Sequence, residues 1–366
     1  MNRCKTFFKQ EFVLCIAAVL AVASMFWNPP SPAYAGFIDF RVLMLLFCLM
    51  AVVAGLRQCG LFDVLAQHML QGRKNIRALC LMLVLLPFFT SMLITNDVAL
   101  ITFVPFAILI LQTTSQTRLL IWIITLQTVA ANLGSMFTPF GNPQNLYLYN
   151  LFQIPLPSFF ATVALPTILS LAALIVCACC VKGENIEVSF RQPARIISSR
   201  HLMIYIIWFA VCLLSVFRLL PAWILLLALL AFLSIWNRSL LRQVDYSLLL
   251  TFVCFFVFVG NLGSLPAVRS ILSSLLNGRE VIVAALSCQA ISNVPAAVLL
   301  SGFTDQWRGL LLGVNLGGLG TIIASMASLI SFKYYLRTAG AKPLRYLAVF
   351  TLTNAVWLAV LLLLIH

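Results

Sequence analysis

The chain has 366 residues, of which 63% are hydrophobic and only 9% are charged, and its mean hydropathy is +1.07. A water-soluble domain of this composition would expose one continuous apolar surface, so the sequence excludes that class of protein. Apolar runs of roughly 20 residues, long enough to cross a bilayer, recur along the whole length. The sequence therefore predicts an all-α polytopic membrane protein whose main partner is the lipid bilayer.

The net charge of +14 does not indicate a nucleic-acid partner, because Lys and Arg collect in short loops between apolar runs, as the positive-inside rule requires. Most of the eleven cysteines lie inside apolar runs. The tightest group, Cys177-Ala-Cys179-Cys180, lacks the spacing of a metal site. The three histidines all stand at segment edges. We therefore expect no disulfide framework, no zinc site and no cofactor.

The first 35 residues allow two interpretations. A basic start, an apolar stretch to Trp27 and the triplet Ala33-Tyr34-Ala35 resemble a secretory signal with a cleavage site. The same stretch also fits the first span of a duplicated unit. We prefer the second interpretation, because the duplication needs this helix.

Two stretches of the chain match when they are laid together, which indicates an internal duplication. Residues 132–146 read NLGSMFTPFGNPQNL, and residues 315–329 read NLGGLGTIIASMASL. The matched polar positions are Asn132 with Asn315, Gly134 with Gly317, Thr138 with Thr321, and Asn142 with Ser325. Matches further upstream are Thr95-Asn96-Asp97 with Ser292-Asn293-Val294, Gly72-Arg73 with Gly278-Arg279, and Asp39-Phe40 with Asp245-Tyr246.

The distribution of basic residues predicts that the two halves are inverted relative to each other in the membrane. The N-terminus is placed in the cytoplasm, with residues 57–77 inside. Repeat 1 (1–181) would then contain two spans, a re-entrant hairpin, a broken helix and a return span, at 12–27, 42–56, 78–112, 118–148 and 156–181. The run 142–154 contains no Lys or Arg and is expected to form an outer loop.

A cytoplasmic linker and a connecting span (182–220) would follow, with 182–200 inside. The apolar run 201–236 is too long for one crossing and breaks at Arg218 and Pro221. The extra span reverses repeat 2 (221–366), placing 261–279 and the C-terminus outside. Repeat 2 would contain a second hairpin at 280–304 and a broken helix at 308–331. The predicted fold is an inverted-topology repeat of about nine to eleven spans plus two re-entrant hairpins.

Polar residues interrupt both hairpins and both broken helices. Where a helix stops inside a bilayer, its unpaired N–H and C=O groups need a partner, which an ion, a substrate or water can supply. Helix capping explains either hairpin tip alone, but it does not explain why the tips match. We expect convergence on one substrate- and ion-binding site made by Thr95, Asn96, Asp97, Asn132, Gly134, Ser135, Thr138, Gly141, Asn142, Asn145, Ser292, Asn293, Asn315, Gly317, Gly318, Thr321 and Ser325.

Asp97 is the one acidic residue that lies deep within an apolar run. A lone charge there costs at least about 2.5–3.5 kcal/mol on insertion scales, and no Lys or Arg lies between Arg77 and Arg118. A proton, a bound cation or a distant partner must therefore neutralise the carboxylate. The alternative is a protonated Asp97 that acts only as a structural cap.

At these residues the sequence resembles the ion transporter superfamily, which includes citrate transporters, divalent anion:sodium symporters, arsenite permeases and some sodium/proton antiporters. The most specific stretches are ITNDVAL, GNPQNLYLY, ISNVPAA and NLGGLGT, and the similarity covers residues 12–365. It looks closest to short bacterial citrate-transporter-like anion permeases. The resemblance implies a mobile transport domain, a scaffold domain that forms homodimers, a small anionic substrate and a place in the bacterial cytoplasmic membrane.

The symporters of this superfamily carry Ser-Asn-Thr at both hairpin tips and hold sodium there, which implies Na⁺ near Asn96, Asp97 and Asn293. This sequence departs from that pattern at the third positions, Asp97 and Val294. An aspartate beside the site repels a divalent anion unless a proton or Na⁺ is bound. It would also suit an antiporter or a carrier of a neutral species such as arsenite.

The leading hypothesis is an H⁺- or Na⁺-coupled secondary transporter of a small inorganic or organic anion. The main alternative is a sodium/proton antiporter or an arsenite-type efflux permease. An intramembrane enzyme is disfavoured, because a single buried aspartate cannot form an aspartyl protease and no histidine within a span can activate Ser135. The sequence also lacks His-Glu-x-x-His. We expect the protein not to be an enzyme.

Overall fold

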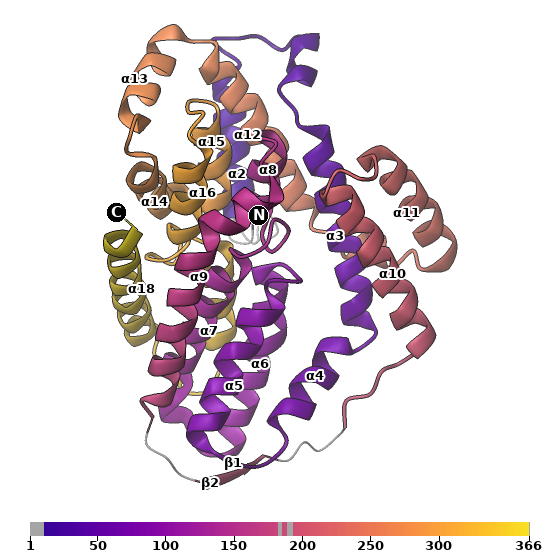
Figure 1. Ribbon diagram of the computed structural model, residues 1–366, viewed down its shortest axis with the longest axis vertical. Helices are drawn as coiled ribbons and strands as arrows, with labels where there is room; N and C mark the ends of the chain where they lie inside the picture. Colours follow the sequence, from indigo (N-terminus) through magenta and orange to yellow (C-terminus); the bar gives the residue numbers. More distant parts are fainter. Residues whose placement is uncertain (1–10, 182–184, 189–192, 366) are drawn as a thin grey trace, which may run out of the picture.

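The computed structural model describes residues 11–181, 185–188 and 193–365. These residues are almost entirely helical, and the helices pack as one bundle (Figure 1). The helices up to the end of repeat 1 are α2 (Phe12–Ser24), η1 (Pro32–Gly36), α3 (Phe40–Gln58), α4 (Leu61–Leu70), α5 (Ile76–Thr90), α6 (Asn96–Thr113), η2 (Thr117–Leu119), α7 (Leu120–Ser135), α8 (Pro143–Leu151) and α9 (Leu156–Cys179).

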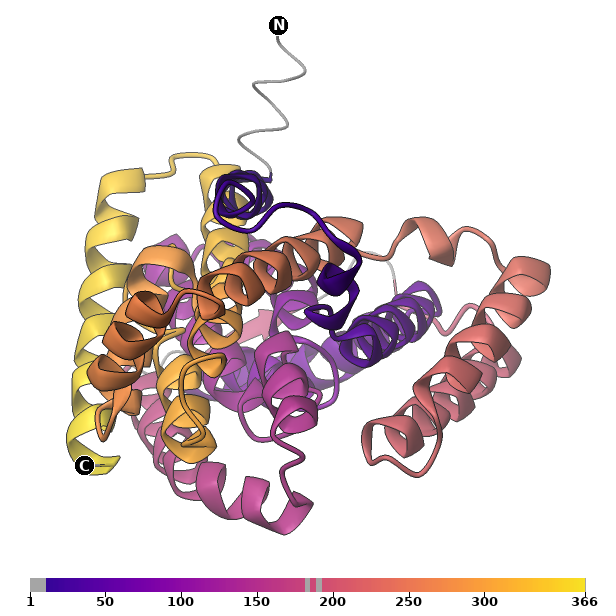
Figure 2. The same cartoon turned by 90° about the horizontal axis from the view of Figure 1, so that it is seen from above.

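The remaining helices are α10 (Ser199–Val216), α11 (Ala222–Trp236), η3 (Leu240–Arg242), α12 (Tyr246–Gly263), α13 (Pro266–Leu276), α14 (Glu280–Ile291), α15 (Asn293–Ser301), α16 (Trp307–Leu316), α17 (Met326–Leu336) and α18 (Pro343–Ile365). The apolar run 201–236 forms two helices, as predicted, and Arg218 adopts a φ of 68° between them. Seen from above, α10 and α11 lie at one edge of the molecule and α18 at the opposite edge (Figure 2).

Membrane-crossing helices dominate the described chain. Seven helices are long and apolar enough to span a bilayer, or up to eight if the bent pair α13 and α14 counts as one. This confirms a polytopic, all-α membrane protein. The count of long helices is below the predicted number of spans, because α2 and α11 are apolar but shorter and because the α16–α17 segment is interrupted.

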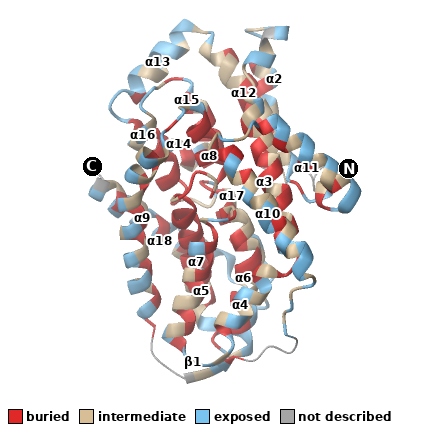
Figure 3. Ribbon diagram, turned by 45° about the vertical axis from the view of Figure 1, so that its right-hand side comes forward, coloured by how far each residue is buried: buried red, intermediate tan, exposed pale blue. Residues whose placement is uncertain are grey.

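The two predicted hairpins occupy opposite halves of the molecule. In the first hairpin α5 packs against α6, and residues 91–95 join them. In the second, α14 packs against α15, and Ser292 turns the chain with a φ of 73°. Figures 1 and 3 show α5 and α6 in the lower half and α14 and α15 in the upper half. An inverted repeat predicts this arrangement; the side of the membrane that each half faces stays a prediction.

A short two-stranded sheet marks the lower end of the molecule in Figure 1. Strand β1 (Gly72–Asn75) pairs antiparallel with β2 (Asn185–Val188), and Arg73 forms an ion pair with Glu187 at 3.8 Å. The loop after α4 therefore lies beside the linker between the halves. Two linker segments, 182–184 with Lys182 and 189–192 with Arg191, lie outside the described residues, as do the first ten residues.

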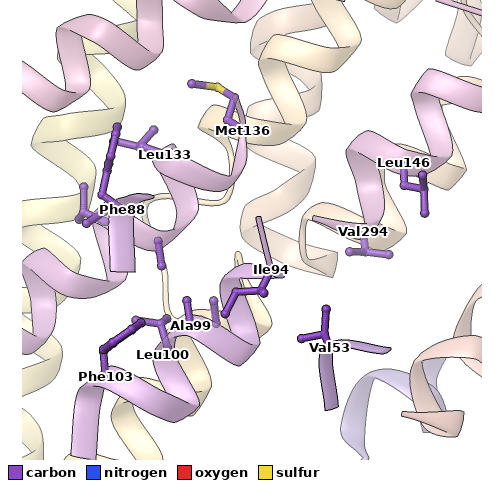
Figure 4. Packing of buried hydrophobic residues seen from close by; sticks show 14 of the residues in the cluster. Val53, Phe88, Ile94, Ala99, Leu100, Phe103, Leu133, Met136, Leu146 and Val294 are labelled. Carbon is purple, nitrogen blue, oxygen red and sulfur yellow. The ribbon is translucent and has the colours of Figure 1, made fainter. Parts of the chain in front are cut away.

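Burial divides the side chains as expected for a protein in lipid. Buried residues gather in the middle of the bundle, whereas exposed ones cover α9, α10 and α11 (Figure 3). In the centre, Phe88 and Leu133 lie side by side near Ala99 and Leu100 (Figure 4). Large apolar side chains are exposed on the outer helices, at Ile168, Ile207, Leu227, Leu352 and Val356. A homodimer formed through these outer surfaces stays a prediction.

The predicted outer loop at 142–154 is wrong. Residues 143–151 form α8, and the side chains of 143–150 are buried. Asn142 accepts a hydrogen bond from the Asn145 N–H, and Pro143 occupies the first helical position, so the sequence starts a helix here. The absence of basic residues therefore accompanies a buried helix instead of an exposed loop, and the side of the membrane on which this helix lies stays a prediction.

Strand β1 and helix α13 lie at opposite ends of the molecule. We therefore expect exposed residues on them to be accessible from opposite sides of the membrane. In a variant without native cysteines, Arg73→Cys on β1 should react with a membrane-impermeant maleimide only from the cytoplasmic side. Ser270→Cys on α13, at the other end of the molecule, should react only from outside. Labelling of intact cells and inverted vesicles makes this comparison, and reaction of both residues from one side would contradict the inverted arrangement.

Candidate functional site

Each hairpin tip is hydrogen-bonded to the interruption of a broken helix in its own half. The Asn96 N–H donates to the Gly141 carbonyl at 3.2 Å, and the Asn293 N–H donates to the Ala324 carbonyl at 2.9 Å. Asn96 and Asn293 hold matching positions in the two halves, and so do Gly141 and Ala324. Both bonds satisfy backbone groups that a helix end would otherwise leave unpaired within the membrane.

A second pair of contacts repeats in the same way. The Thr138 hydroxyl donates to the Met92 carbonyl at 2.6 Å, and the Thr321 hydroxyl donates to the Gln289 carbonyl at 3.3 Å. Thr138 matches Thr321, and Met92 matches Gln289 when the hairpin tips are aligned. The two halves therefore share their local bonding as well as their order of elements.

Gly134 and Gly317 serve close packing within each half. A Cβ atom on Gly134 would lie 2.7 Å from Ser91 Oγ, and one on Gly317 would lie 2.7 Å from Cys288 Sγ. Ser91 and Cys288 also occupy matching positions. The absence of a side chain lets α7 approach α5 and lets α16 approach α14, so the structure assigns these two predicted site residues a packing role.

Five buried polar side chains join the two halves at the centre. The Asn142 amide donates to Asn315 Oδ1 at 3.0 Å, and the Asn315 amide donates to Asn145 Oδ1 at 2.7 Å. The Ser325 hydroxyl donates to Asn132 Oδ1 at 3.0 Å. Asn132 matches Asn315, and Ser325 matches Asn142. The same bond is therefore made twice, once from repeat 1 to repeat 2 and once from repeat 2 to repeat 1. None of these side chains is more than 3% exposed.

The hairpin tips reach this amide cluster. The Asn96 amide donates to Asn132 Oδ1 at 2.9 Å, and the Asn132 amide donates to the Gly318 carbonyl at 3.4 Å. Asn293 also lies against Gly318, because a Cβ atom on Gly318 would be 3.1 Å from Asn293 Nδ2. The Ser135 hydroxyl accepts from the Asn142 amide at 3.1 Å. The structure thus brings the predicted polar residues together; their role as ligands stays a prediction.

A cavity of about 410 Å³, here called the first cavity, reaches the tip of the first hairpin. Side chains of α3, α6 and α17 form most of its apolar wall. Its charged residues are Arg57, Asp97 and Asp245, and Thr95 and Gln243 also line it. Arg57, Gln243 and Asp245 are exposed, whereas Thr95 and Asp97 are only partly exposed, so the cavity connects the surface with Asp97. In the described chain, Asp97 takes part in no ion pair.

A smaller cavity of about 160 Å³, here called the second cavity, lies beside the second hairpin. Many of its lining residues match those of the first cavity when the halves are aligned. The matched pairs are Phe37 with Gln243, Tyr147 with Ile330, Phe256 with Met50, Val259 with Val53, Gly260 with Ala54, and Val298 with Ile101. The two cavities are therefore equivalent places in the two halves of the molecule.

Aromatic side chains narrow the second cavity. The Phe37 ring rests on Gly260, where a Cβ atom would lie 2.7 Å from Phe37 Cδ1. The Tyr147 and Ser301 hydroxyls form a hydrogen bond at 2.8 Å, and the Tyr147 ring packs against Phe256 with centroids 5.6 Å apart. The first cavity has Gln243, Ile330 and Met50 at the matching positions, which explains its larger volume.

A citrate transporter family model matches residues 8–305. The chain belongs to the citrate transporter family. It is 33% identical over 300 residues to the Uncharacterized transporter MJ0456 of Methanocaldococcus jannaschii, covering 81% of each chain. It is 29% identical over 327 residues to the Inner membrane protein YbiR of Escherichia coli, covering 86% of this chain and 85% of the other. The expected resemblance is thereby confirmed, and the protein is a multi-pass membrane transporter.

Two charged residues of this citrate transporter family member, Arg57 and Asp245, line the first cavity but were not predicted from the sequence. Arg57 lies in the last turn of α3 and Asp245 caps α12, and both line the first cavity although they are remote from Asp97 in the chain. The alignment of Asp39 with Asp245 could have drawn attention to Asp245. Both aspartates cap a helix, because each side chain accepts a hydrogen bond from a helical N–H. Nothing in the sequence placed Arg57 near the hairpin.

The amide cluster predicts a measurable coupling between the halves. Asn315→Ala removes the acceptor of one Asn142 Nδ2 hydrogen bond and the donor to Asn145 Oδ1, which should destabilise the protein by about 1–2 kcal/mol. The matched control is Asn354→Ala, whose amide donates only to the Phe350 carbonyl of its own helix. Thermal unfolding in detergent should show a clearly larger loss for Asn315→Ala. An equal drop in unfolding temperature for both variants would mean that the hydrogen bonds between the halves contribute no more stability than a bond within one helix.

Proposed function

We propose that this protein is an ion-coupled secondary transporter that moves a small organic or inorganic anion, with H⁺ or Na⁺ as the coupling ion. The observation that carries the proposal is the position of Asp97, which lies at the tip of a hairpin and lines a cavity open to the surface. The citrate transporter family supports an anionic substrate. The geometry supports a single central site shared by the two halves.

The charges of the first cavity explain why a coupling ion is needed. Two carboxylates, Asp97 and Asp245, and one guanidinium, Arg57, line it. With both carboxylates ionised these groups sum to a negative charge, which repels an anion in a site of low dielectric constant. A proton or Na⁺ on Asp97 removes that repulsion, and the anion then faces Arg57 and the polar hairpin tip. Binding of the cation before the anion couples the two fluxes.

The matched cavities support transport by alternating access. In inverted-repeat carriers, one half rocks against the other around a fixed central site. The first cavity is the larger of the two and aromatic side chains narrow the second, as expected of a carrier whose two approaches to the site open in turn. If the two cavities exchanged shapes, the second would widen and the first would narrow, while the central binding site stayed at the same depth in the membrane.

The same charges also favour a second function. A cavity with two carboxylates and one guanidinium accepts Na⁺ and H⁺ in turn, as a sodium/proton antiporter requires. Purified protein in liposomes distinguishes the two functions. A transporter should take up a radiolabelled anion from a panel that includes citrate when a pH or Na⁺ gradient is imposed. An antiporter should exchange Na⁺ for H⁺ with no anion present.

Asp97→Asn tests the coupling. The substitution keeps the size and hydrogen-bonding capacity of the side chain but removes its exchangeable proton, so the variant should fold and carry substrate without accumulating it against a gradient. The matched control is Asp39→Asn, because Asp39 caps α3 and lines neither the first nor the second cavity. Asn caps a helix about as well as Asp, so the control should keep gradient-driven uptake. Uptake by Asp97→Asn that still depends on pH or Na⁺ as in the wild type would reduce Asp97 to a structural cap.

Tyr147→Phe tests the exchange of the two cavities. The substitution removes the hydroxyl that forms a hydrogen bond with Ser301. This should destabilise the conformation with the narrowed second cavity by about 0.5–1.5 kcal/mol, which shifts the equilibrium between the two conformations roughly two- to tenfold. Maleimide should therefore react faster at Val259→Cys and more slowly at Val53→Cys. Tyr149→Phe on the same helix, which lines neither cavity, is the control. Unchanged rates at both positions would contradict paired opening and closing.

A further inference from the structure

A third cavity lies away from the two already described. It has a volume of about 460 Å³ and opens where α7 begins, α17 ends and α18 begins. The residues that define its chemistry are Thr117, Arg118, Trp122, Tyr335, Lys342 and Arg345. We call it the basic cavity. None of its lining residues belongs to the site around Asp97.

The basic cavity concentrates positive charge. Arg118 comes from η2, and Lys342 and Arg345 flank the first residues of α18. Among the described residues that line it there is no Asp or Glu. Arg118, Lys342 and Arg345 are exposed, and Arg118 Nε also donates to Gln116 Oε1 at 3.2 Å. The three cations give the mouth of the cavity a positive potential that favours an anion. The Lys342 N–H donates to the Tyr335 hydroxyl at 3.0 Å, which fixes the loop that presents Lys342.

The surroundings of the basic cavity are those of a membrane boundary. Helix α18 lies at the outside of the bundle (Figure 2), and its exposed apolar residues Leu352, Val356 and Val360 are spaced four apart, along one side. Trp122, at the cavity wall, is partly exposed. Tryptophan and basic residues together are typical of the level of lipid head groups. An apolar strip therefore runs from the cavity toward the membrane interior.

We propose that the basic cavity binds the phosphodiester head group of an anionic phospholipid, whose acyl chains lie along α18. Phosphate oxygens accept from the guanidinium groups of Arg118 and Arg345 and from the Lys342 ammonium. Basic pockets between membrane helices on the cytoplasmic side have the right chemistry for such head groups. A free phosphate ion would use the same cations but would leave the apolar strip of α18 without a function.

The bound lipid would connect parts of the transport machinery. Helix α7 carries Asn132, and α17 follows Ser325, the two residues whose bond joins the halves. A head group bound between η2 and the start of α18 would connect the first turn of α7 with the last helix of the chain. We therefore expect anionic lipid to raise the thermal stability of the whole protein.

Native mass spectrometry of the purified wild-type protein tests this inference without any substitution. In mixed micelles the protein should retain phosphatidylglycerol or cardiolipin in preference to phosphatidylcholine, and anionic lipid should raise the unfolding temperature. Inorganic phosphate alone should not reproduce that rise. Equal retention of all three lipids, or an equal rise with phosphate alone, would overturn the proposal.

A pair of variants locates the site. Lys342→Gln/Arg345→Gln should bind anionic lipid about tenfold or more weakly, since each basic residue contributes about 1 kcal/mol. The control is Arg238→Gln/Arg242→Gln, which removes the same charge from exposed positions near η3 that do not line the basic cavity. Equal weakening in both variants would show a general effect of net charge and would overturn the assignment to this cavity.

Discussion

A chain inside a bilayer has no water with which to complete its backbone hydrogen bonds, and the arrangement of this protein depends on how its interrupted helices meet that constraint. Each half places the interruption of a hairpin against the interruption of a broken helix. The Asn96 N–H then pairs with the Gly141 carbonyl, and the Asn293 N–H pairs with the Ala324 carbonyl. Because the hairpin and the broken helix satisfy each other, neither can move alone without exposing unpaired groups. We therefore expect the hairpin and the broken helix of each half to move together.

Hydrogen bonds between the halves differ from the backbone hydrogen bonds within each half. They are made by side chains, Asn142 with Asn315 and Asn132 with Ser325, and the same bond is made in both directions. Side-chain hydrogen bonds in membranes contribute on average about 0.6 kcal/mol each. A few such bonds can set the register of the two halves and still allow them to exchange partners, whereas the backbone pairs within a half stay fixed.

The sequence predicted the parts of this fold that depend on local pattern. Paired Ser/Thr-Asn tips mark both hairpins, and clusters of Gly and Asn mark both broken helices, with Pro added only in the first, because those residue types end and start helices. The region 142–154 was mispredicted, since an absence of basic residues fits an outer loop and a buried helix equally well. Arg57 and Asp245 escaped notice because three-dimensional proximity to Asp97 leaves no trace in spacing along one sequence. Only their packing in the fold brings them together.

The two halves keep the same bonding but differ in charge. Asp97 matches Val294, Arg57 matches Gly263, and Gln243 matches Phe37. The positions that hold the backbone together are mostly Asn, Gly, Ser and Thr in both halves. Among those that face the cavities, three are aromatic in the second cavity (Phe37, Tyr147 and Phe256) where the first has Gln243, Ile330 and Met50. A site at the junction of the halves needs one coupling carboxylate, since a second at Val294 would repel an anion from the opposite side as well. Under the proposed function, this difference in charge between matched halves gives one shared site two different approaches, and only the approach through the first cavity carries the carboxylate proposed to bind the coupling ion.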